Sequence, residues 1–283
     1  MKVACIGLGR MGSGIAENVR RRGWPLAVWN RAAEKMDPFQ AIGVKTAPTA
    51  REAACGADVV ITSLMDDASV FETLLGSNGI LTGLDRGAIH IGTSTISPGG
   101  STRLADLHTE HGSYYLAAPV LGRPDAAAAG KLFALVAGAQ EIVERARPVL
   151  ESYTQKIILL GEDPAAAASM KLASNFFAAS LLEILGQAFA FAEKRGVLDP
   201  MAAMLKTFLP MDEYINRIAE RNYEKPGFTL DAGLKDVRLI LEAAGEVHVA
   251  LPFASVIRDK CLAAQARGLG QRDWCAFTEL ARG

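Results

Sequence analysis

Three glycines near the N-terminus, Gly7, Gly9 and Gly12, are spaced as G-x-G-x-x-G, directly after the apolar run at 3–6 and before a helical pattern. Gly7 would allow a tight turn, Gly9 would let a pyrophosphate approach the backbone, and Gly12 would let the helix pack closely on the strand. The phosphates would lie at the helix N-terminus, where free N–H groups and the helix dipole favour negative charge. The segment therefore predicts a strand, a turn and a helix that bind a dinucleotide.

The residues after the second apolar run bear on which dinucleotide binds. A site that prefers NAD usually has Asp or Glu there to accept from the ribose 2′-OH. This chain has the uncharged Asn30, then Arg31, with Lys35 one turn further on. A carboxylate would repel a 2′-phosphate, whereas Arg31 would attract it and could stack on adenine. The pattern favours NADP over NAD, and the alternative is that Arg31 is an ordinary surface cation.

Lys171 and Asn175 lie four residues apart in a long apolar helical stretch, so they share one face of that helix. Burying a lysine and an amide there costs free energy unless partners exist. A lysine beside a nicotinamide can hydrogen-bond a carbonyl oxygen and donate a proton as hydride reaches the carbon. Asn175 can orient that ammonium or the substrate. The alternative is that Lys171 extends along the apolar surface to solvent.

Two further segments carry groups that could serve a site. Lys235 and Asp236 begin another expected helix, and by residue type alone they are typical of a solvated pair. The stretch 118–124 ends an expected strand, at the sheet edge where doubly wound folds bind ligands. Its proline and glycine residues also suit a simple turn.

Residues 1–161 alternate between strand and helix patterns. This alternation predicts an α/β fold with a mostly parallel, doubly wound sheet and helices on both faces, that is, a Rossmann-like domain. The expected strands are 3–6, 26–30, 59–64, 88–92, 114–118, 133–137 and 156–160. The expected helices between them are 13–22, 49–55, 68–75, 99–111 and 139–153.

The pattern changes after residue 161, where strand-like runs stop. Asp163 as N-cap and Pro164 at the first helical position predict a long helix over about 164–195, which ends before Gly196. The remainder is expected to form helices broken near residues 210, 226 and 252. We expect a dinucleotide-binding domain at 1–161 and an all-α substrate and dimerisation domain at 162–283, joined by the long helix.

The long helix also predicts self-association. It is rich in Ala, Leu and Phe over most of its circumference, and a helix that is apolar nearly all round must be buried. At 1.5 Å per residue it would measure roughly 45 Å, which is longer than a small domain. We therefore expect part of it to be buried against a second subunit in a homodimer.

Composition narrows the class of protein. The net charge of −1 gives no electrostatic reason to expect nucleic acid or an acidic membrane surface as partner. No apolar run reaches about 18 residues, so no membrane span is expected. The N-terminal residues have the pattern of a strand rather than of a signal peptide. The four scattered cysteines favour free buried thiols in a reducing, cytoplasmic compartment. His108 and His111, on an expected surface helix, are not expected to bind a metal.

Taken together, these segments resemble the β-hydroxyacid dehydrogenase family, which includes 3-hydroxyisobutyrate dehydrogenase and the glyoxylate/succinic semialdehyde reductases. The resemblance covers nearly the whole chain. The stretch 7–18, GLGRMGSGIAEN, is similar to the family's GxGxMGxxMAxN cofactor signature, with Ile15 where methionine is usual. Asn30, Arg31 and Lys35 match its NADP-type N-R-x-x-x-K segment.

Four later segments follow the family in order. The stretch 64–66, LMD, stands where the family has L-P-D beneath the nicotinamide ribose, and 94–98, STISP, matches its S-T-x-x-P. Lys171 with Asn175 matches the catalytic K-x-x-x-N motif, and 235–236 matches a later K-D motif near the cofactor. The resemblance implies that Lys171 is the general acid in reduction.

These inferences give three sets of candidate residues. The catalytic candidates are Lys171 and Asn175. The cofactor-binding candidates are Gly7, Leu8, Gly9, Arg10, Met11, Gly12, Asn30, Arg31, Lys35, Leu64, Met65, Thr95 and Lys235. The substrate candidates are Ser94, Val120, Leu121, Gly122, Arg123 and Asp236.

One departure from the family concerns the substrate. Where the family typically has D-A-P-V-S-G-G, this chain has AAPVLGR at 117–123. Leu121 replaces the serine that usually helps to hold a substrate carboxylate, and leucine donates no hydrogen bond. Arg123 could supply a bidentate replacement, or it could point to solvent while the site accepts a less acidic substrate.

The favoured reading is an NADPH-dependent reductase of small aldehydes or keto acids that runs in reverse as a hydroxyacid dehydrogenase. The alternative is an imine reductase, which the apolar Leu121 favours and Lys171 opposes, since an ammonium would repel an iminium. A third reading is a cofactor-binding protein without catalysis, related to chromatin-associated members of the family, but this chain lacks their extra reader segments.

Overall fold

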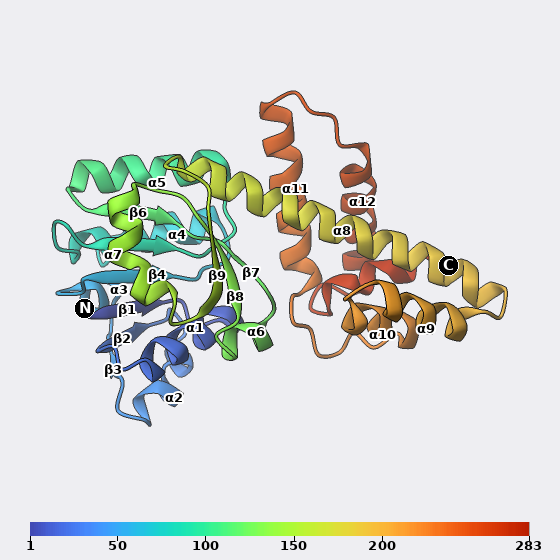
Figure 1. Cartoon of the computed structure of the whole chain (residues 1–283), viewed down its shortest axis with the longest axis horizontal. Helices are drawn as coiled ribbons and strands as arrows, with labels where there is room; N and C mark the ends of the chain where they lie inside the picture. Colours follow the sequence, from blue (N-terminus) through green and yellow to red (C-terminus); the bar gives the residue numbers. More distant parts are fainter. Residues whose placement is uncertain (283) are drawn as a thin grey trace. The chain divides into compact units, whose positions relative to one another are not determined.

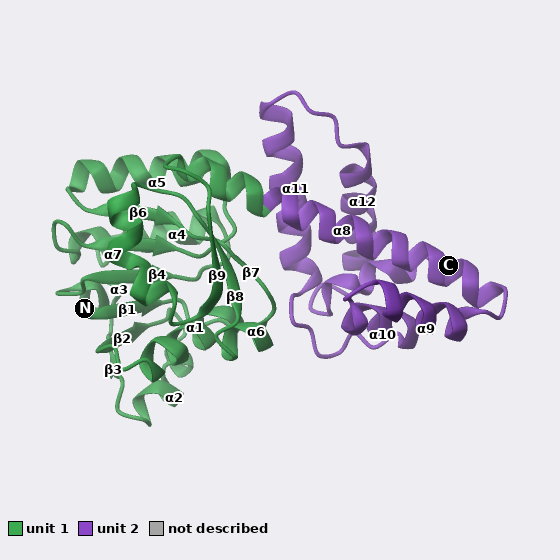
Figure 2. Ribbon diagram, in the orientation of Figure 1, with its two compact units in different colours: residues 1–171 green, residues 172–283 purple. Residues whose placement is uncertain are grey.

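The computed structural model describes residues 1–282 and contains two compact units, at 1–171 and 172–283 (Figure 2). The first unit extends beyond the boundary expected at residue 161, because the first two turns of the long helix belong to it. Ala167 of that helix lies in the core of the first unit, and Ser101 Oγ donates a hydrogen bond to the carbonyl of Pro164 at 3.1 Å.

The main sheet of the first unit is parallel, with strand order β3-β2-β1-β4-β5-β6 (Figure 1). Strands β1, β4 and β5 are buried along their whole length, which explains why they are continuous apolar runs rather than alternating ones. The order reverses at β1, so ligands are expected at the carboxyl end of this strand. The strands are β1 (Val3–Ile6), β2 (Leu26–Trp29), β3 (Lys45–Thr46), β4 (Val59–Thr62), β5 (Ile89–Gly92) and β6 (Tyr114–Ala117).

Helices cover both faces of this sheet, as expected for a doubly wound fold. One core cluster joins α1 and α7 to one face, and a second joins α3, α4 and α5 to the other. Side-chain caps define several helix starts, since Thr49, Asp66 and Ser97 each accept a backbone N–H three residues on. The helices are α1 (Arg10–Arg21), η1 (Ala33–Lys35), α2 (Asp37–Gln40), α3 (Ala50–Ala54), α4 (Asp67–Leu75), η2 (Ile80–Thr82), α5 (Pro98–His111), α6 (Pro124–Ala128) and α7 (Gln140–Leu150).

A second sheet corrects the expectation that all strands share one sheet. β7 (Val120–Leu121) pairs antiparallel with β8 (Leu132–Val136), which pairs parallel with β9 (Thr154–Leu159). Among the described residues, the two sheets are linked by one isolated β-bridge. It joins Ala117, at the end of β6, to Ala137, the residue after β8. Pro119 follows β6 and has no N–H to continue the ladder, so the chain leaves the main sheet there.

The second unit is helical and has its own core. The long helix α8, whose first two turns belong to the first unit, begins as expected, with Asp163 Oδ1 accepting the N–H of Ala165 at 2.9 Å. It ends before Gly196, whose φ is +72°. The helices after α8 are interrupted near the prolines where breaks were expected. The helices from residue 164 onward are α8 (Pro164–Lys194), α9 (Leu198–Phe208), α10 (Asp212–Glu220), α11 (Leu230–Glu246), α12 (Pro252–Ala266) and η3 (Trp274–Ala281).

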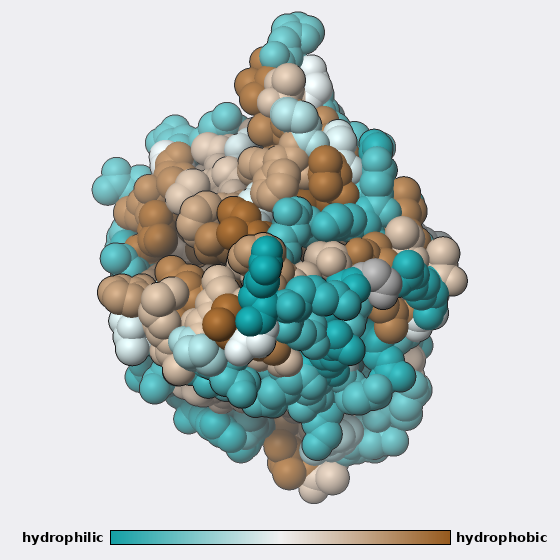
Figure 3. All heavy atoms as spheres, turned by 90° about the vertical axis from the view of Figure 1, so that its right-hand side faces the viewer, coloured by the Kyte–Doolittle hydropathy of each residue, from teal (hydrophilic) through white to brown (hydrophobic). Residues whose placement is uncertain are grey.

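Part of the surface of α8 is exposed in the single chain. Phe177, Ile184 and Phe191 are 66%, 55% and 66% exposed in the single chain. Apolar patches also interrupt the hydrophilic surface in Figure 3. By length and composition α8 is long and apolar enough to cross a membrane, contrary to the expectation from apolar run length. However, 44% of its most apolar window is buried, and the core helices of soluble proteins pass the same test.

Two expectations about cysteine and histidine side chains are wrong. Cys55 is exposed, whereas the other three cysteines are buried thiols. His108 is fully buried rather than on a helix surface, and its Nε2 lies 2.8 Å from Nδ1 of His90. His90 Nε2 continues this hydrogen-bonded chain to Thr62 Oγ1 at 2.8 Å. Burial lowers the pKa of His108 to about 4, so both rings are neutral near pH 7.

Candidate functional site

The glycine-rich turn lies at the carboxyl end of β1, where the strand order reverses. Gly7 has φ +93°, a conformation that L side chains rarely adopt, and a Cβ there would lie 2.3 Å from the carbonyl oxygen of Ser63. A Cβ on Gly12 would lie 1.9 Å from the Gly7 carbonyl oxygen. A Cβ on Gly9 would meet no atom within 4 Å. The turn is therefore tightly packed at its two ends and open at Gly9, the N-cap of α1, which fits a phosphate group.

Asn30, at the end of β2, has a role that the sequence did not reveal. Its Oδ1 accepts the N–H of Leu8 at 2.8 Å, and its Nδ2 donates to the Ala32 carbonyl at 2.9 Å. The side chain thus ties the glycine-rich turn to the segment that follows β2. Arg31 is 82% exposed and lies 3.7 Å from Glu72, an exposed pair that water screens.

The segments after β4 and β5 lie at the same edge of the sheet as this turn, because β4 pairs in parallel with β1 and β5 pairs in parallel with β4. Ser94 is 8% exposed, and its Oγ accepts the N–H of Leu64 at 2.8 Å. Met65 is 60% exposed. Leu64, Met65, Ser94 and Thr95, all candidates from sequence, therefore belong to two adjoining loops at the carboxyl edge of the sheet.

In the second unit, Asn175, Lys235 and Asp236 meet. Asn175 Nδ2 donates to Asp236 Oδ2 at 2.5 Å, and Lys235 Nζ lies 2.6 Å from Asp236 Oδ1. Asp236 is 1% exposed, so the reading of 235–236 as a solvated pair is wrong. A buried carboxylate needs such partners, because leaving it unpaired would cost several kcal/mol.

Lys171, the other catalytic candidate, is half-buried and lies one helical turn before Asn175 on α8. Residues four apart on a helix are neighbours on its surface. The asparagine amide uses its NH₂ group toward Asp236, which leaves its carbonyl oxygen as the acceptor that a neighbouring ammonium can use.

The substrate candidates at 120–123 form a strand and a turn rather than a turn alone. Val120 is buried, and Leu121 is the cross-strand partner of Phe133. Gly122 has φ +137°, which redirects the chain into α6. The Nε and Nη1 atoms of Arg123 are buried, so this side chain does not simply extend into solvent.

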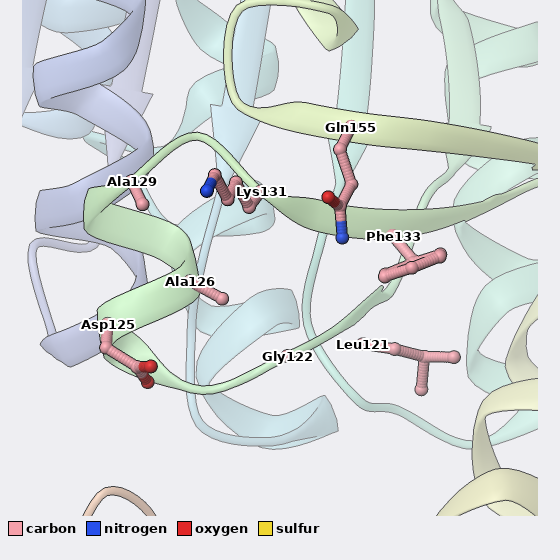
Figure 4. Close-up of a pocket in the computed structure, with 8 residues that line it drawn as sticks. All are labelled: Leu121, Gly122, Asp125, Ala126, Ala129, Lys131, Phe133 and Gln155. Carbon is pink, nitrogen blue, oxygen red and sulfur yellow. The ribbon is translucent and has the colours of Figure 1, made fainter. Parts of the chain in front are cut away.

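A pocket of about 700 Å³ opens beside this segment (Figure 4). The methyl groups of Ala126 on α6 and of Ala129, its C-cap, face the pocket from one side, and the side chains of Leu121 and Phe133 lie together at its other end. Its size is in the range of small-molecule sites. Its lining residues are Leu121, Gly122, Asp125, Ala126, Ala129, Lys131, Phe133 and Gln155.

Within residues 1–282, no group of three or more His, Cys, Asp or Glu side chains is arranged to hold a metal ion.

Two protein-family models match the chain. One is described as the NAD binding domain of 6-phosphogluconate dehydrogenase and matches residues 2–161. The other is described as the NAD-binding domain of NADP-dependent 3-hydroxyisobutyrate dehydrogenase and matches residues 165–281. The first match ends before α8 begins, and the second starts in the first turn of α8.

Similar proteins span the whole chain. An uncharacterised oxidoreductase of Bacillus subtilis, YfjR, is 41% identical over 281 residues, 98% of each chain. The 3-sulfolactaldehyde reductase of Escherichia coli is 31% identical and covers 99% of this chain and 95% of its own.

Solved structures are similar too. That of 3-hydroxyisobutyrate dehydrogenase from Salmonella typhimurium has a TM-score of 0.90 at 25% identity, with 99% of both chains covered. An imine reductase of Streptomyces aurantiacus has a TM-score of 0.64 at 25% identity over 100% of both chains.

Proposed function

Since the chain belongs to the β-hydroxyacid dehydrogenase family of NAD(P)-dependent oxidoreductases, we propose that it transfers hydride between NADP(H) and a small aldehyde or keto acid. In reverse it would oxidise a β-hydroxyacid. The observation that carries the proposal is the arrangement on α8, where the amide of Asn175, one turn after Lys171, is held by the buried carboxylate of Asp236. Such an arrangement suits a lysine that must keep one orientation.

The described residues fit a dinucleotide. The open space at Gly9 would admit the pyrophosphate to the N-terminus of α1. Leu8, Arg10 and Met11 lie around the same helix start, and the loops at 64–65 and 94–95 would border the nicotinamide end. When bound, the reduced cofactor supplies the hydride.

In this proposal Lys171 is the general acid of reduction. Its ammonium hydrogen-bonds the substrate's carbonyl oxygen and gives up a proton as the carbonyl carbon gains hydride, so the product is an alcohol. Asn175 orients the ammonium through its carbonyl oxygen, and Asp236, with Lys235 beside it, fixes Asn175. In the oxidative direction the neutral amine of Lys171 takes the same proton back.

Preference for NADP rests on the cations after β2. Arg31 is exposed, and its pairing with the exposed Glu72 is weak in water, so its guanidinium is available to a 2′-phosphate at low cost. Lys35 follows it in η1. Asn30 brings no negative charge, and its hydrogen bond to Leu8 holds it against the turn.

The substrate would have an apolar part beside its carbonyl group. Leu121 and Phe133 offer an apolar wall, and the buried guanidinium atoms of Arg123 lie two residues after Leu121. The names of similar proteins point to semialdehydes and sulfolactaldehyde as related substrates. We therefore favour small aldehydes with an acidic group as the first compounds to test.

Reduction of a C=N bond is the second candidate. The apolar wall at Leu121 and the similarity to a solved imine reductase favour it. Lys171 opposes it, because its ammonium would repel an iminium substrate.

A homodimer through α8 is part of the proposal. Phe177, Ile184 and Phe191 are spaced by seven residues, so they form one exposed apolar stripe on the helix. Exposing such a stripe to water is unfavourable. In a two-fold arrangement centred on Ile184, Phe177 of one copy would face Phe191 of the other.

Turnover with a defined panel tests the proposed reaction. The purified protein would be mixed with NADPH or NADH and with glyoxylate, succinic semialdehyde, 3-sulfolactaldehyde or a cyclic imine. We expect NADPH oxidation with at least one aldehyde and little with the imine. Turnover with the imine alone would favour the second candidate, and no turnover with any carbonyl compound would count against the first.

A further inference from the structure

Asp67, the first residue of α4, holds the loop that precedes α5. Its Oδ1 accepts a hydrogen bond from Ser97 Oγ at 2.6 Å, and both carboxylate oxygens accept from Ser97 N, at 3.1 and 3.2 Å. Hydrogen bonds to an ionised acceptor are stronger than those between neutral groups. Neither residue is among the site candidates drawn from the sequence.

The local packing is built around this contact. A Cβ on Gly100 would lie 2.2 Å from Asp67 Oδ1, so the absence of a side chain there lets the carboxylate approach the first turn of α5. Ser97 is also the N-cap of α5, since its Oγ accepts the N–H of Gly100 at 2.9 Å. A carboxylate at this helix N-terminus is favoured by the helix dipole.

The neighbouring Asp66 is the N-cap of α4. It caps α4 by accepting the N–H of Ser69 at 2.8 Å, in a reciprocal capping box. Asp67 is therefore not required to cap α4, and its carboxylate is directed to the next loop instead.

The same two loops are joined a second time. Leu64 N donates to Ser94 Oγ at 2.8 Å, three residues before Ser97. The stretch 94–97 is thus fixed at both ends to the segment 64–67, at the carboxyl ends of β4 and β5. In a doubly wound sheet with phosphates at the β1 turn, one half of the dinucleotide lies over β2 and the other over β4 and β5.

We propose that Asp67 is a positioning residue that, through Ser97, fixes the wall of the pocket for the nicotinamide half of the cofactor. The inference rests on the dinucleotide binding of the proposed function. It adds that the two loops must be held together for the nicotinamide half to bind, while the adenosine half binds independently of them.

Binding of whole and truncated cofactors tests this. Isothermal titration calorimetry would measure the Kd of each whole cofactor and of the same molecule without its nicotinamide. The two pairs are NADP⁺ with 2′-phospho-ADP-ribose and NAD⁺ with ADP-ribose. In D67A we expect affinity for the whole cofactor to fall about 10-fold, as for loss of a charged hydrogen bond, with the truncated ligand unchanged. D67N keeps one oxygen acceptor for Ser97, so we expect a smaller loss, of roughly 3-fold.

Thr49→Ala is the control for a purely structural loss, because it removes the N-cap of α3, where Thr49 Oγ1 accepts the N–H of Glu52 at 3.1 Å. It should lower the melting temperature without changing either affinity. Unchanged affinity for the whole cofactor in both D67A and D67N would overturn the proposal, as would an equal loss for whole and truncated ligands. Failure of the wild-type protein to bind any of the four ligands would instead overturn the dinucleotide function itself.

Discussion

Asn175 on α8 donates a hydrogen bond from Nδ2 to Oδ2 of Asp236 on α11, over 2.5 Å. Two helices of the second unit are thereby joined at a residue one turn from Lys171. Asp236 is almost fully buried and is also paired with Lys235 at 2.6 Å. The carboxylate of Asp236 therefore links the amide of Asn175 to the ammonium of Lys235.

This relationship predicts that Asn175 and Asp236 act as a unit. Asn175→Ala and Asp236→Ala should each lower kcat, and the double variant should be little worse than the worse single one. Residues in one network typically couple by about 0.5–3 kcal/mol. A double-mutant cycle in kcat, with Lys206→Ala on the exposed face of α9 as control, measures this coupling. Additive effects would mean that the two side chains serve catalysis separately.

Arg31 should determine the choice of cofactor. Arg31→Ala is expected to raise the KM for NADPH about 10-fold, as for one charge-assisted contact, and to leave the KM for NADH unchanged. Glu72→Gln, which removes the exposed partner 3.7 Å away, should leave both constants nearly unchanged. Steady-state kinetics with both cofactors provides the comparison. An equal change for NADPH and NADH in Arg31→Ala would argue against a 2′-phosphate contact.

The buried histidines predict a loss of stability in acid. Burial and the neighbouring His111 lower the pKa of His108 to about 4, and burial with His108 lowers that of His90. Below about pH 6.5, His90 and His108 bind protons in the unfolded chain but remain neutral in the folded chain. The free energy of unfolding should therefore be fully retained above about pH 6.5 and fall between pH 6.5 and 4, by on the order of 3 kcal/mol for His108 alone.

Urea unfolding at pH 7.5 and pH 5 measures this effect. His108→Gln removes the titrating ring and should make stability less dependent on pH, even if stability at pH 7.5 falls. His248→Asn is a suitable control, because His248 is exposed and asparagine tolerates its positive φ of 57°. The same pH dependence in His108→Gln as in the wild type would assign the acid sensitivity to other groups.

The exposed stripe on α8 predicts a dimer that a single charge disrupts. Ile184→Arg places a charge at the centre of the stripe formed by Phe177, Ile184 and Phe191, so association should weaken strongly. Light scattering at micromolar concentration measures the mass. Val247→Arg introduces the same charge at another exposed apolar site, and it should leave the mass unchanged. A monomeric wild-type protein would remove the basis of this prediction.

The sequence predicted the long elements of the fold well and the short ones poorly. The buried runs at β1, β4 and β5 and the capped start of α8 carry strong local signals. β3 and β7 have two residues each, which is too short for a periodic pattern. The second sheet could not be foreseen, because partner choice between strands depends on where Pro119 turns the chain in three dimensions.

In the candidate site, too, local features could be predicted from the sequence, whereas contacts between distant residues could not. The glycine spacing predicted a turn whose backbone geometry matches the expected demands at Gly7, Gly9 and Gly12. The burial of Asp236 could not be read from a Lys-Asp dipeptide, because its partner Asn175 is distant in sequence. The hydrogen bond of Asn30 to Leu8 was hidden for the same reason.

The most direct test of the account is the single-turnover rate of NADPH oxidation by Lys171→Ala with the best aldehyde substrate. Loss of the proton donor should lower this rate about 100-fold or more, while the Kd for NADPH changes less than about 2-fold. Lys206→Ala should match the wild type in both. A Lys171→Ala rate within a few-fold of the wild type, at saturating substrate, would contradict the assignment of Lys171 as the general acid.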